Sequence, residues 1–199
     1  MLGPTDSSEA RQEAPGSIRA QFGTDKTRNA CHGADSVESA KREADFFFGK
    51  KRRQNTARFR DSTLGIVKPH AVIGGLTGQI MREISAAGLK ITAVQLHNVE
   101  KANAQEFYEV YKGVVAEYNQ MVDELSSGPC IALEVSGENS HGAFRELVGP
   151  SDPEIARHLR PHSIRAKFGE DKIKNALHCS DLPDDSALEV EYFFKILDS

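Results

Sequence analysis

A short polar segment near the C-terminus combines side chains that are typical of a functional site. Asn175 to Asp181 reads Asn-Ala-Leu-His-Cys-Ser-Asp, and Asn29 to Asp35 is a near copy, Asn-Ala-Cys-His-Gly-Ala-Asp. A neutral imidazole can act as a nucleophile or carry a proton near neutral pH. A lone histidine is more often structural, but a histidine that recurs in register with other polar residues indicates a catalytic role.

The near copy is part of a longer internal repeat with a constant offset of 146 residues. The matched pairs are Gly3 and Gly149, Arg19 and Arg165, His32 and His178, and Glu43 and Glu189. Shared Arg, Asn and His are harder to attribute to packing than shared apolar residues. We therefore expect residues 1–48 to be the C-terminal part of one domain, residues 49–62 a basic linker, and residues 63–199 a complete second domain.

Composition narrows the class of protein. The 199 residues carry a formal charge of −4, which argues against a nucleic-acid-binding surface. Three cysteines, no signal peptide and no apolar run of about 20 residues indicate a reducing environment and no membrane span. The sequence predicts a soluble intracellular protein.

Two segments around the first repeat raise separate expectations. Residues 3–48 lack an upstream half, so Phe46, Phe47 and Phe48 should be exposed, and the segment should be partly disordered or docked as an appendage. Its abrupt start at Met1 suggests a truncated product of a longer chain. The six basic residues of 49–62 indicate a solvated tether, a nuclear address or a contact for an acidic surface such as tubulin tails.

The elements that must position these residues follow from periodicity and punctuation. The expected order is a strand over 63–67, a helix over 76–88, a strand over 89–97, two short helices over 103–125, a strand over 130–135, a helix over 139–149 with Asn139 as N-cap, a loop over 150–163 and a short strand near 174–177. This βαββαβ order predicts a ferredoxin-like α+β fold with a four-stranded antiparallel sheet covered by helices. That fold alone does not define a function.

Several motifs together resemble the nucleoside diphosphate kinase family. They are Lys68-Pro69-His70, Ser127-Gly128-Pro129, Arg145 with Gly149, Ser163-Ile164-Arg165 with Phe168-Gly169, and Asn175-x-x-His178-x-Ser180-Asp181. The resemblance covers residues 63–194 and again 3–48. It implies exchange of γ-phosphates between nucleoside tri- and diphosphates through a phosphohistidine.

The resemblance implies a role for each matched residue. His178 would be the phosphorylated nucleophile and Glu189 the carboxylate that orients its ring. The nucleotide-binding residues would be Arg145, Arg165 and Ser151 on the phosphates, Lys68 and Asn175 on the sugar hydroxyls and terminal phosphate, and Tyr108 beside the nucleophile. Magnesium would be carried by the phosphates of ATP or another nucleoside triphosphate, without a protein cage. A strand-end lysine such as Lys68 can also be simply solvated.

Some positions depart from the family pattern. The family's base-stacking Phe corresponds to Ala116 or Glu117, and Tyr118 could replace it. Lys172 stands in place of a Val across the base, so activity should be reduced. In the first copy, the Lys, the Tyr and the first Arg are absent, so we expect that site to be inactive.

Other candidate groups are weaker. His158 and His162 have a zinc-like spacing but no partner cysteines or carboxylates, so no metal site is predicted. His70, His97 and His141 belong to no recognisable cluster. Cys179 is either a reactive thiol or a replacement for the glycine that the family has there.

Two functions remain in view. The first is an active nucleoside diphosphate kinase in the cytoplasm. The second is a weakly active or inactive structural module on microtubules, centrosomes or cilia, with tubulin or centrosomal proteins as partners. The resemblance to double-headed family members implies this alternative. The family also pairs through its second strand and first helix, which implies a homo-oligomer.

Overall fold

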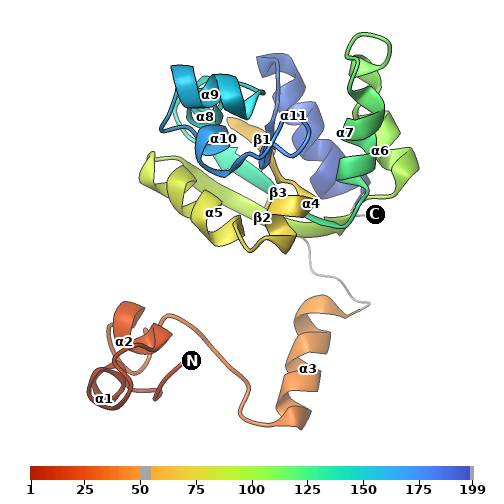
Figure 1. The fold of residues 1–199 in the computed structure, drawn as a ribbon. Helices are drawn as coiled ribbons and strands as arrows, with labels where there is room; N and C mark the ends of the chain where they lie inside the picture. Colours follow the sequence, from red (N-terminus) through yellow and green to blue (C-terminus); the bar gives the residue numbers. More distant parts are fainter. Residues whose placement is uncertain (50–54, 198–199) are drawn as a thin grey trace. The chain divides into compact units, whose positions relative to one another are not determined.

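The computed structural model describes residues 1–49 and 55–197, which fall into two compact units, Met1–Gln54 and Asn55–Ser199 (Figure 1). Unit 1 contains three helices, α1 (Ser7–Glu13), α2 (Ile18–Phe22) and α3 (Val37–Phe48), and its described residues form no strand. In the described part of the chain, no helix is long and apolar enough to span a membrane.

Unit 2 holds the sheet and the remaining helices. The elements before the third strand are β1 (Ser62–Val67), α4 (Pro69–Ile73), α5 (Thr77–Ala86), β2 (Lys90–Asn98), α6 (Lys101–Phe107), a 3-10 turn (Glu109–Tyr111) and α7 (Tyr118–Leu125). They are followed by β3 (Pro129–Ser136), α8 (Ser140–Val148), α9 (Pro153–Leu159), α10 (Ile164–Phe168), β4 (Leu177–Cys179), α11 (Pro183–Glu191) and a π-helical turn (Tyr192–Ile196).

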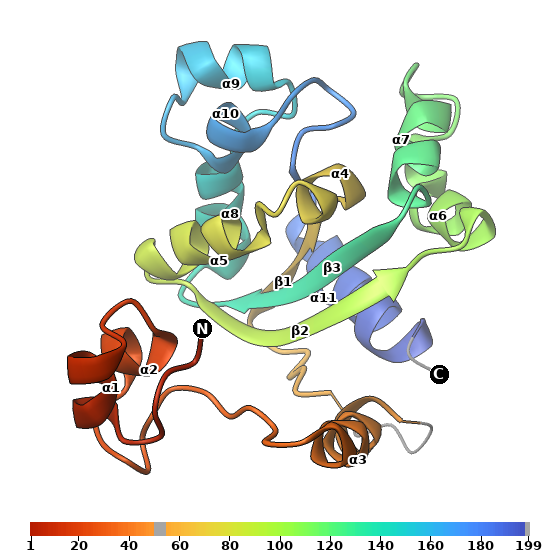
Figure 2. The same ribbon diagram turned by 60° about the horizontal axis from the view of Figure 1, so that its bottom comes forward.

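The sheet has the order β2-β3-β1-β4, and its three strand pairs are antiparallel. Helices cover both faces, with α5 and α8 on one side and α11 on the other (Figure 2). This arrangement confirms the predicted ferredoxin-like α+β fold.

The central strand β1 is buried along its whole length. Leu64 and Ile66 belong to one core cluster with residues of α6, α7 and α11, whereas Val67 belongs to a second cluster with residues of α5 and α8. Gly65 lies under Phe144, because a Cβ there would sit 2.8 Å from the ring. The two cores fix the sheet between its helical layers, so the end of β1 is held rigidly beside β4.

Two local predictions are wrong, whereas Asn139 is the N-cap residue of α8 as predicted. The loop expected over 150–163 contains α9, which begins at Pro153 and is capped by the Asp152 carboxylate accepting a hydrogen bond from the Glu154 N–H. The last strand is Leu177–Cys179 rather than 174–177. Asn139 precedes α8 but has a φ of 48° and makes no capping hydrogen bond with its side chain.

The expected linker over 49–62 divides into two parts. Lys50 to Gln54 lie outside the described residues. Beyond them, the chain lies against unit 2, because the fully buried Glu134 carboxylate on β3 accepts hydrogen bonds from the N–H groups of Arg58 and Phe59. Ser62 and Thr92 donate their hydroxyls to the same carboxylate. These contacts anchor the entry to β1.

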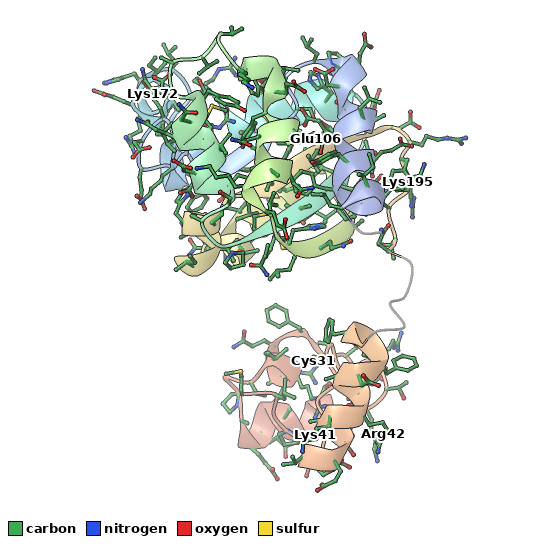
Figure 3. All side chains as sticks on the ribbon, turned by 90° about the vertical axis from the view of Figure 1, so that its right-hand side faces the viewer. Cys31, Lys41, Arg42, Glu106, Lys172 and Lys195 are labelled. Atoms are coloured by element: carbon green, nitrogen blue, oxygen red, sulfur yellow. The ribbon has the colours of Figure 1, made fainter. Side chains whose placement is uncertain are left out.

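Unit 1 leaves an aromatic surface exposed, as the sequence predicts. Phe46, Phe47 and Phe48 of α3 are 53%, 59% and 87% exposed, on a helix whose Lys41 and Arg42 also face solvent (Figure 3). In unit 2, the repeat counterparts of Phe47 and Phe48 are Phe193 and Phe194, which are 0% and 2% exposed. The same aromatic pair is therefore core in one unit and surface in the other.

This contrast predicts different costs for matched substitutions. Phe193→Ala should lower the free energy of unfolding of unit 2 by about 3–5 kcal/mol, because it leaves a cavity in a packed core. Phe47→Ala should change the stability of either unit by less than about 0.5 kcal/mol, because its ring is exposed. Denaturant unfolding followed by circular dichroism measures both variants, and equal losses would contradict the assignment.

Candidate active site

His178 is held in the middle of β4 by a carboxylate from α11. Its Nε2 lies 3.0 Å from Glu189 Oε2, and Ser180 Oγ donates to the same oxygen at 2.8 Å. An ionised carboxylate only accepts hydrogen bonds, so Nε2 carries the proton and Nδ1 keeps a free lone pair. The rings of Phe107 and Tyr108 lie edge-on to the imidazole, with centroids 5.2 and 6.1 Å away. The histidine is thus oriented and partly desolvated, as a nucleophile requires.

Two guanidinium groups lie beside this histidine, each held by backbone carbonyls. Arg165 donates from Nε to Leu177 O at 3.1 Å and from Nη1 to Gly149 O at 2.9 Å. Arg145 donates from Nη1 to Ser180 O at 3.0 Å and to Asp181 Oδ1 at 2.7 Å. Guanidinium groups fixed in this way are suited to binding phosphate oxygens.

These groups open into one cavity of about 790 Å³. Seven of the eight residues predicted from the sequence line it: Lys68, Tyr108, Arg145, Ser151, Arg165, Asn175 and His178. The eighth, Glu189, lies behind the imidazole and contacts it from α11. The structure therefore brings all eight predicted residues to one place.

Lys68, at the end of β1, is a buried lysine with an unusual pKa. Its Nζ donates to Ile173 O at 2.7 Å. Burial, assisted by the nearby Arg165 guanidinium, lowers the pKa of Lys68 to about 7. An anion entering the cavity would favour the charged form, so this lysine can respond to a phosphate.

Asn175 offers an unused acceptor in the same cavity. Its Nδ2 donates to Ser151 O at 2.8 Å, whereas its buried Oδ1 has no hydrogen-bond partner among the described residues. A buried acceptor without a partner costs free energy, and a ligand hydroxyl would relieve that cost.

Two further residues at the site, Tyr111 and Asp181, were not among the residues predicted from the sequence. The Tyr111 hydroxyl donates to Asp181 Oδ2 at 2.5 Å, and both residues line the cavity. Burial opposes ionisation of Asp181, but the hydrogen bonds from Tyr111 and Arg145 lower its pKa. The repeat contained a signal for Asp181, because Asp35 occupies the matched position in unit 1.

The outer wall of the cavity, formed by α9, α7 and the segment after Tyr111, has aliphatic side chains, Met121 and Glu117 but no aromatic ring. The residues from α9, α7 and the segment before α7 that line it are Ile155, Leu159, Val115, Glu117 and Met121. Tyr118 is not among the lining residues, because its hydroxyl donates to Gln105 O and its ring packs on the core. Tyr118 therefore does not replace the aromatic ring that the family stacks against the nucleotide base. Lys172 lines the cavity near Asp152, with Nζ 3.7 Å from Oδ2, and lies at the periphery of unit 2 (Figure 3).

The repeated motif in unit 1 keeps its local hydrogen bonds but not its surroundings. His32 Nε2 lies 2.9 Å from Glu43 Oε2, and Arg19 donates to Gly3 O at 2.9 Å and to Cys31 O at 3.3 Å. The His32 side chain is 76% exposed, against 8% for His178. The sheet strands that bury the second histidine have no counterpart among the described residues of unit 1.

Metal-ligating side chains do not gather at this site. Among residues 1–49 and 55–197, no group of three or more His, Cys, Asp or Glu side chains could hold a metal ion.

The family model for nucleoside diphosphate kinase matches residues 1–53 and 61–198. The chain belongs to the nucleoside diphosphate kinase family. It is 57% identical over 202 residues to nucleoside diphosphate kinase homolog 7 of Rattus norvegicus, covering 100% of this chain and 51% of that relative. The corresponding protein of Mus musculus is 55% identical, again with 51% covered, so the chain spans about half the length of these curated relatives.

Shorter relatives match about two thirds of the chain. The nucleoside diphosphate kinase of Aquifex aeolicus is 38% identical over 138 residues, covering 69% of this chain and 96% of that protein. An orthorhombic crystal structure of that enzyme aligns with a TM-score of 0.65 over 68% of this chain and 95% of the other. The Encephalitozoon cuniculi kinase, at 23% identity and a TM-score of 0.61, has the same fold.

The lowered pKa of Lys68 predicts how stability depends on pH. Between about pH 7 and 10.5 the unfolded chain holds a proton on this lysine that the folded chain has released, so stability rises with pH. Relative to Lys68→Met, the wild type should gain on the order of 2 kcal/mol in free energy of unfolding from about pH 6.5 to 9. Denaturant titrations at both pH values test this.

Lys90→Met is the matched control, because Lys90 is exposed at the start of β2. Its unfolding free energy should follow that of the wild type at both pH values. If Lys68→Met and the wild type also change in parallel, the pKa of Lys68 is not lowered by burial.

Proposed function

We propose that unit 2 is a nucleoside diphosphate kinase that carries the γ-phosphoryl group on His178. The observation that supports this most strongly is the Glu189–His178 hydrogen bond, which leaves Nδ1 unprotonated beside a cavity lined by Lys68, Arg145 and Arg165. A cationic cavity with a free imidazole nitrogen suits transfer of an anionic phosphoryl group.

In the first half-reaction, Nδ1 of His178 attacks the γ-phosphorus of a nucleoside triphosphate. A nitrogen–phosphorus bond forms, the bond to the bridging oxygen breaks, and the nucleoside diphosphate leaves with that oxygen. The Nε2 proton stays hydrogen-bonded to Glu189, which stabilises the positive charge of the phosphorylated ring. In the second half-reaction, a terminal oxygen of another nucleoside diphosphate attacks phosphohistidine, and the imidazole is released.

The remaining predicted residues would position the phosphates. Arg145 and Arg165 are pre-organised by backbone carbonyls, so they need little rearrangement when charge shifts during transfer. Ser151, Lys68 and Asn175 would contact the phosphate chain and sugar hydroxyls. Magnesium, when bound with the nucleotide, supplies charge neutralisation, and since the described residues form no metal cage, the phosphates would hold it.

We propose that unit 1 is the C-terminal part of a second such domain, and that His32, whose side chain is 76% exposed, does not carry a phosphoryl group in the 199-residue chain. Its exposed Phe47 and Phe48 favour a second candidate function, docking on a protein partner of the microtubule, centrosome or cilium. In that case, the kinase site of unit 2 would be weak or unused. Because members of the family form homo-oligomers, copies of this chain would also pair with one another.

Incubation with γ-labelled ATP tests the kinase directly. The wild type should acquire an acid-labile label that is released by added nucleoside diphosphate, and His178→Ala should lose it by at least about a hundredfold, because the nucleophile is gone. His32→Ala removes the matched histidine of unit 1 and should leave labelling unchanged. Absence of label on the wild type at saturating nucleotide would contradict the kinase and favour the docking function.

The outer wall of the cavity predicts a gain of affinity from an added ring. Glu117→Phe should lower KM for the nucleotide about tenfold, because Glu117 lines the cavity and stacking is worth about 1–3 kcal/mol per base. Ala116→Phe places the same ring on a residue that does not line the cavity, and KM should not fall. Glu117→Gln separates the loss of charge from stacking. An equal fall in KM for Glu117→Gln and Glu117→Phe would contradict the stacking explanation.

A further inference from the structure

A buried histidine outside the predicted site connects three elements around it. His70, in the first turn of α4, places Nδ1 2.6 Å from Glu124 Oε1 on α7. Its Nε2 accepts a hydrogen bond from the Ala176 N–H at 3.2 Å. Both the His70 and the Glu124 side chains are only 8% exposed. The sequence pattern assigned His70 to no cluster, because its partners are 54 and 106 residues away.

The hydrogen bonds define the protonation of this imidazole. Nε2 accepts a hydrogen bond from a backbone N–H, so it must itself be unprotonated. Nδ1 therefore carries the ring proton and donates it to Glu124, whose Oε1 also accepts from the His70 N–H at 3.2 Å. The neutral ring is a fixed bridge with a donor at one end and an acceptor at the other.

The acceptor end holds the turn that leads into β4. Ala176 has a φ of 71°, an uncommon conformation for alanine, and its carbonyl accepts from the Lys68 N–H at 3.0 Å. The same turn exists in unit 1, where Ala30 also has a φ of 71°, so its shape is local. Unit 2 adds the attachment of the turn to α4 through His70. Asn175, just before it, is only 4% exposed.

The donor end reaches α7, which contributes Met121 to the outer wall of the cavity. Glu124 lies on α7 one turn after Met121, which lines the cavity. His178 follows Ala176 by two residues in β4. The Glu124–His70–Ala176 chain of hydrogen bonds thus connects the nucleotide-facing wall to the strand that carries the nucleophile, without touching the cavity itself.

We propose that His70 and Glu124 are positioning residues for phosphoryl transfer, a role that rests on the proposed kinase function. His70 holds the Ala176 turn that leads into β4, and Glu124 orients the His70 ring for that contact. A displacement of about 1 Å at a reacting centre can lower a rate about a hundredfold, so this link acts on kcat although neither residue contacts the nucleotide.

Two conservative variants separate positioning from simple packing. The glutamine amide of His70→Gln extends about as far as Nε2 and can accept from the Ala176 N–H, whereas His70→Asn extends only about as far as Nδ1 and keeps only the Glu124 contact. His70→Asn should lower kcat about ten- to a hundredfold with KM within about threefold of wild type, and His70→Gln should restore most of kcat. His158→Asn and His158→Gln, on the exposed His158 of α9, should leave both parameters unchanged.

Amide hydrogen exchange gives a readout that does not require activity. The Ala176 amide should exchange faster in His70→Asn than in the wild type and in His70→Gln. Equal exchange in all three proteins, or equal loss of kcat in both His70 variants, overturns the proposal. If the wild type acquires no phosphohistidine, the kinase function fails, and the exchange rates alone decide whether His70 holds the turn.

Discussion

The site depends on the Glu189 carboxylate, which accepts hydrogen bonds from His178 Nε2 and Ser180 Oγ at one oxygen. This double contact fixes the ring, its tautomer and the end of β4 together. It also requires α11 to lie across the sheet, where the fully buried Val190 and Phe193 secure the helix and its following turn. Core packing and the tautomer of the His178 ring are therefore consequences of the same arrangement.

The two copies of the motif show which properties are local. Hydrogen bonds within the motif are nearly the same, since the His–Glu distance is 2.9 Å for His32 and 3.0 Å for His178. The exposed fraction of the histidine side chain differs by about an order of magnitude, because strands and the aromatic residues Phe107 and Tyr108 surround the ring in unit 2 but have no counterpart among the described residues of unit 1. The motif specifies geometry, and the sheet supplies the low-dielectric surroundings that strengthen electrostatic interactions.

Apolar runs are local signals, and they predicted the order of the strands along the chain. The eight site residues were predicted from the resemblance to the nucleoside diphosphate kinase family. Sequence patterns missed α9 because Pro150, Pro153 and Pro161 suggested a loop, although Asp152 before Pro153 is a good helix start. They missed His70 for another reason: nothing near it in sequence indicates that it pairs with Glu124 on α7. Contacts that tertiary packing creates have no local signature.

We propose that Nδ1 of His178 receives the phosphoryl group because Glu189 occupies Nε2. Nuclear magnetic resonance of the phosphorylated protein, with ¹⁵N-labelled histidine and ³¹P detection, identifies the nitrogen bonded to phosphorus. We predict a single Nδ1-phosphohistidine that is absent from His178→Ala. A phosphoryl group on Nε2, or on another residue while His178 is intact, would contradict the account.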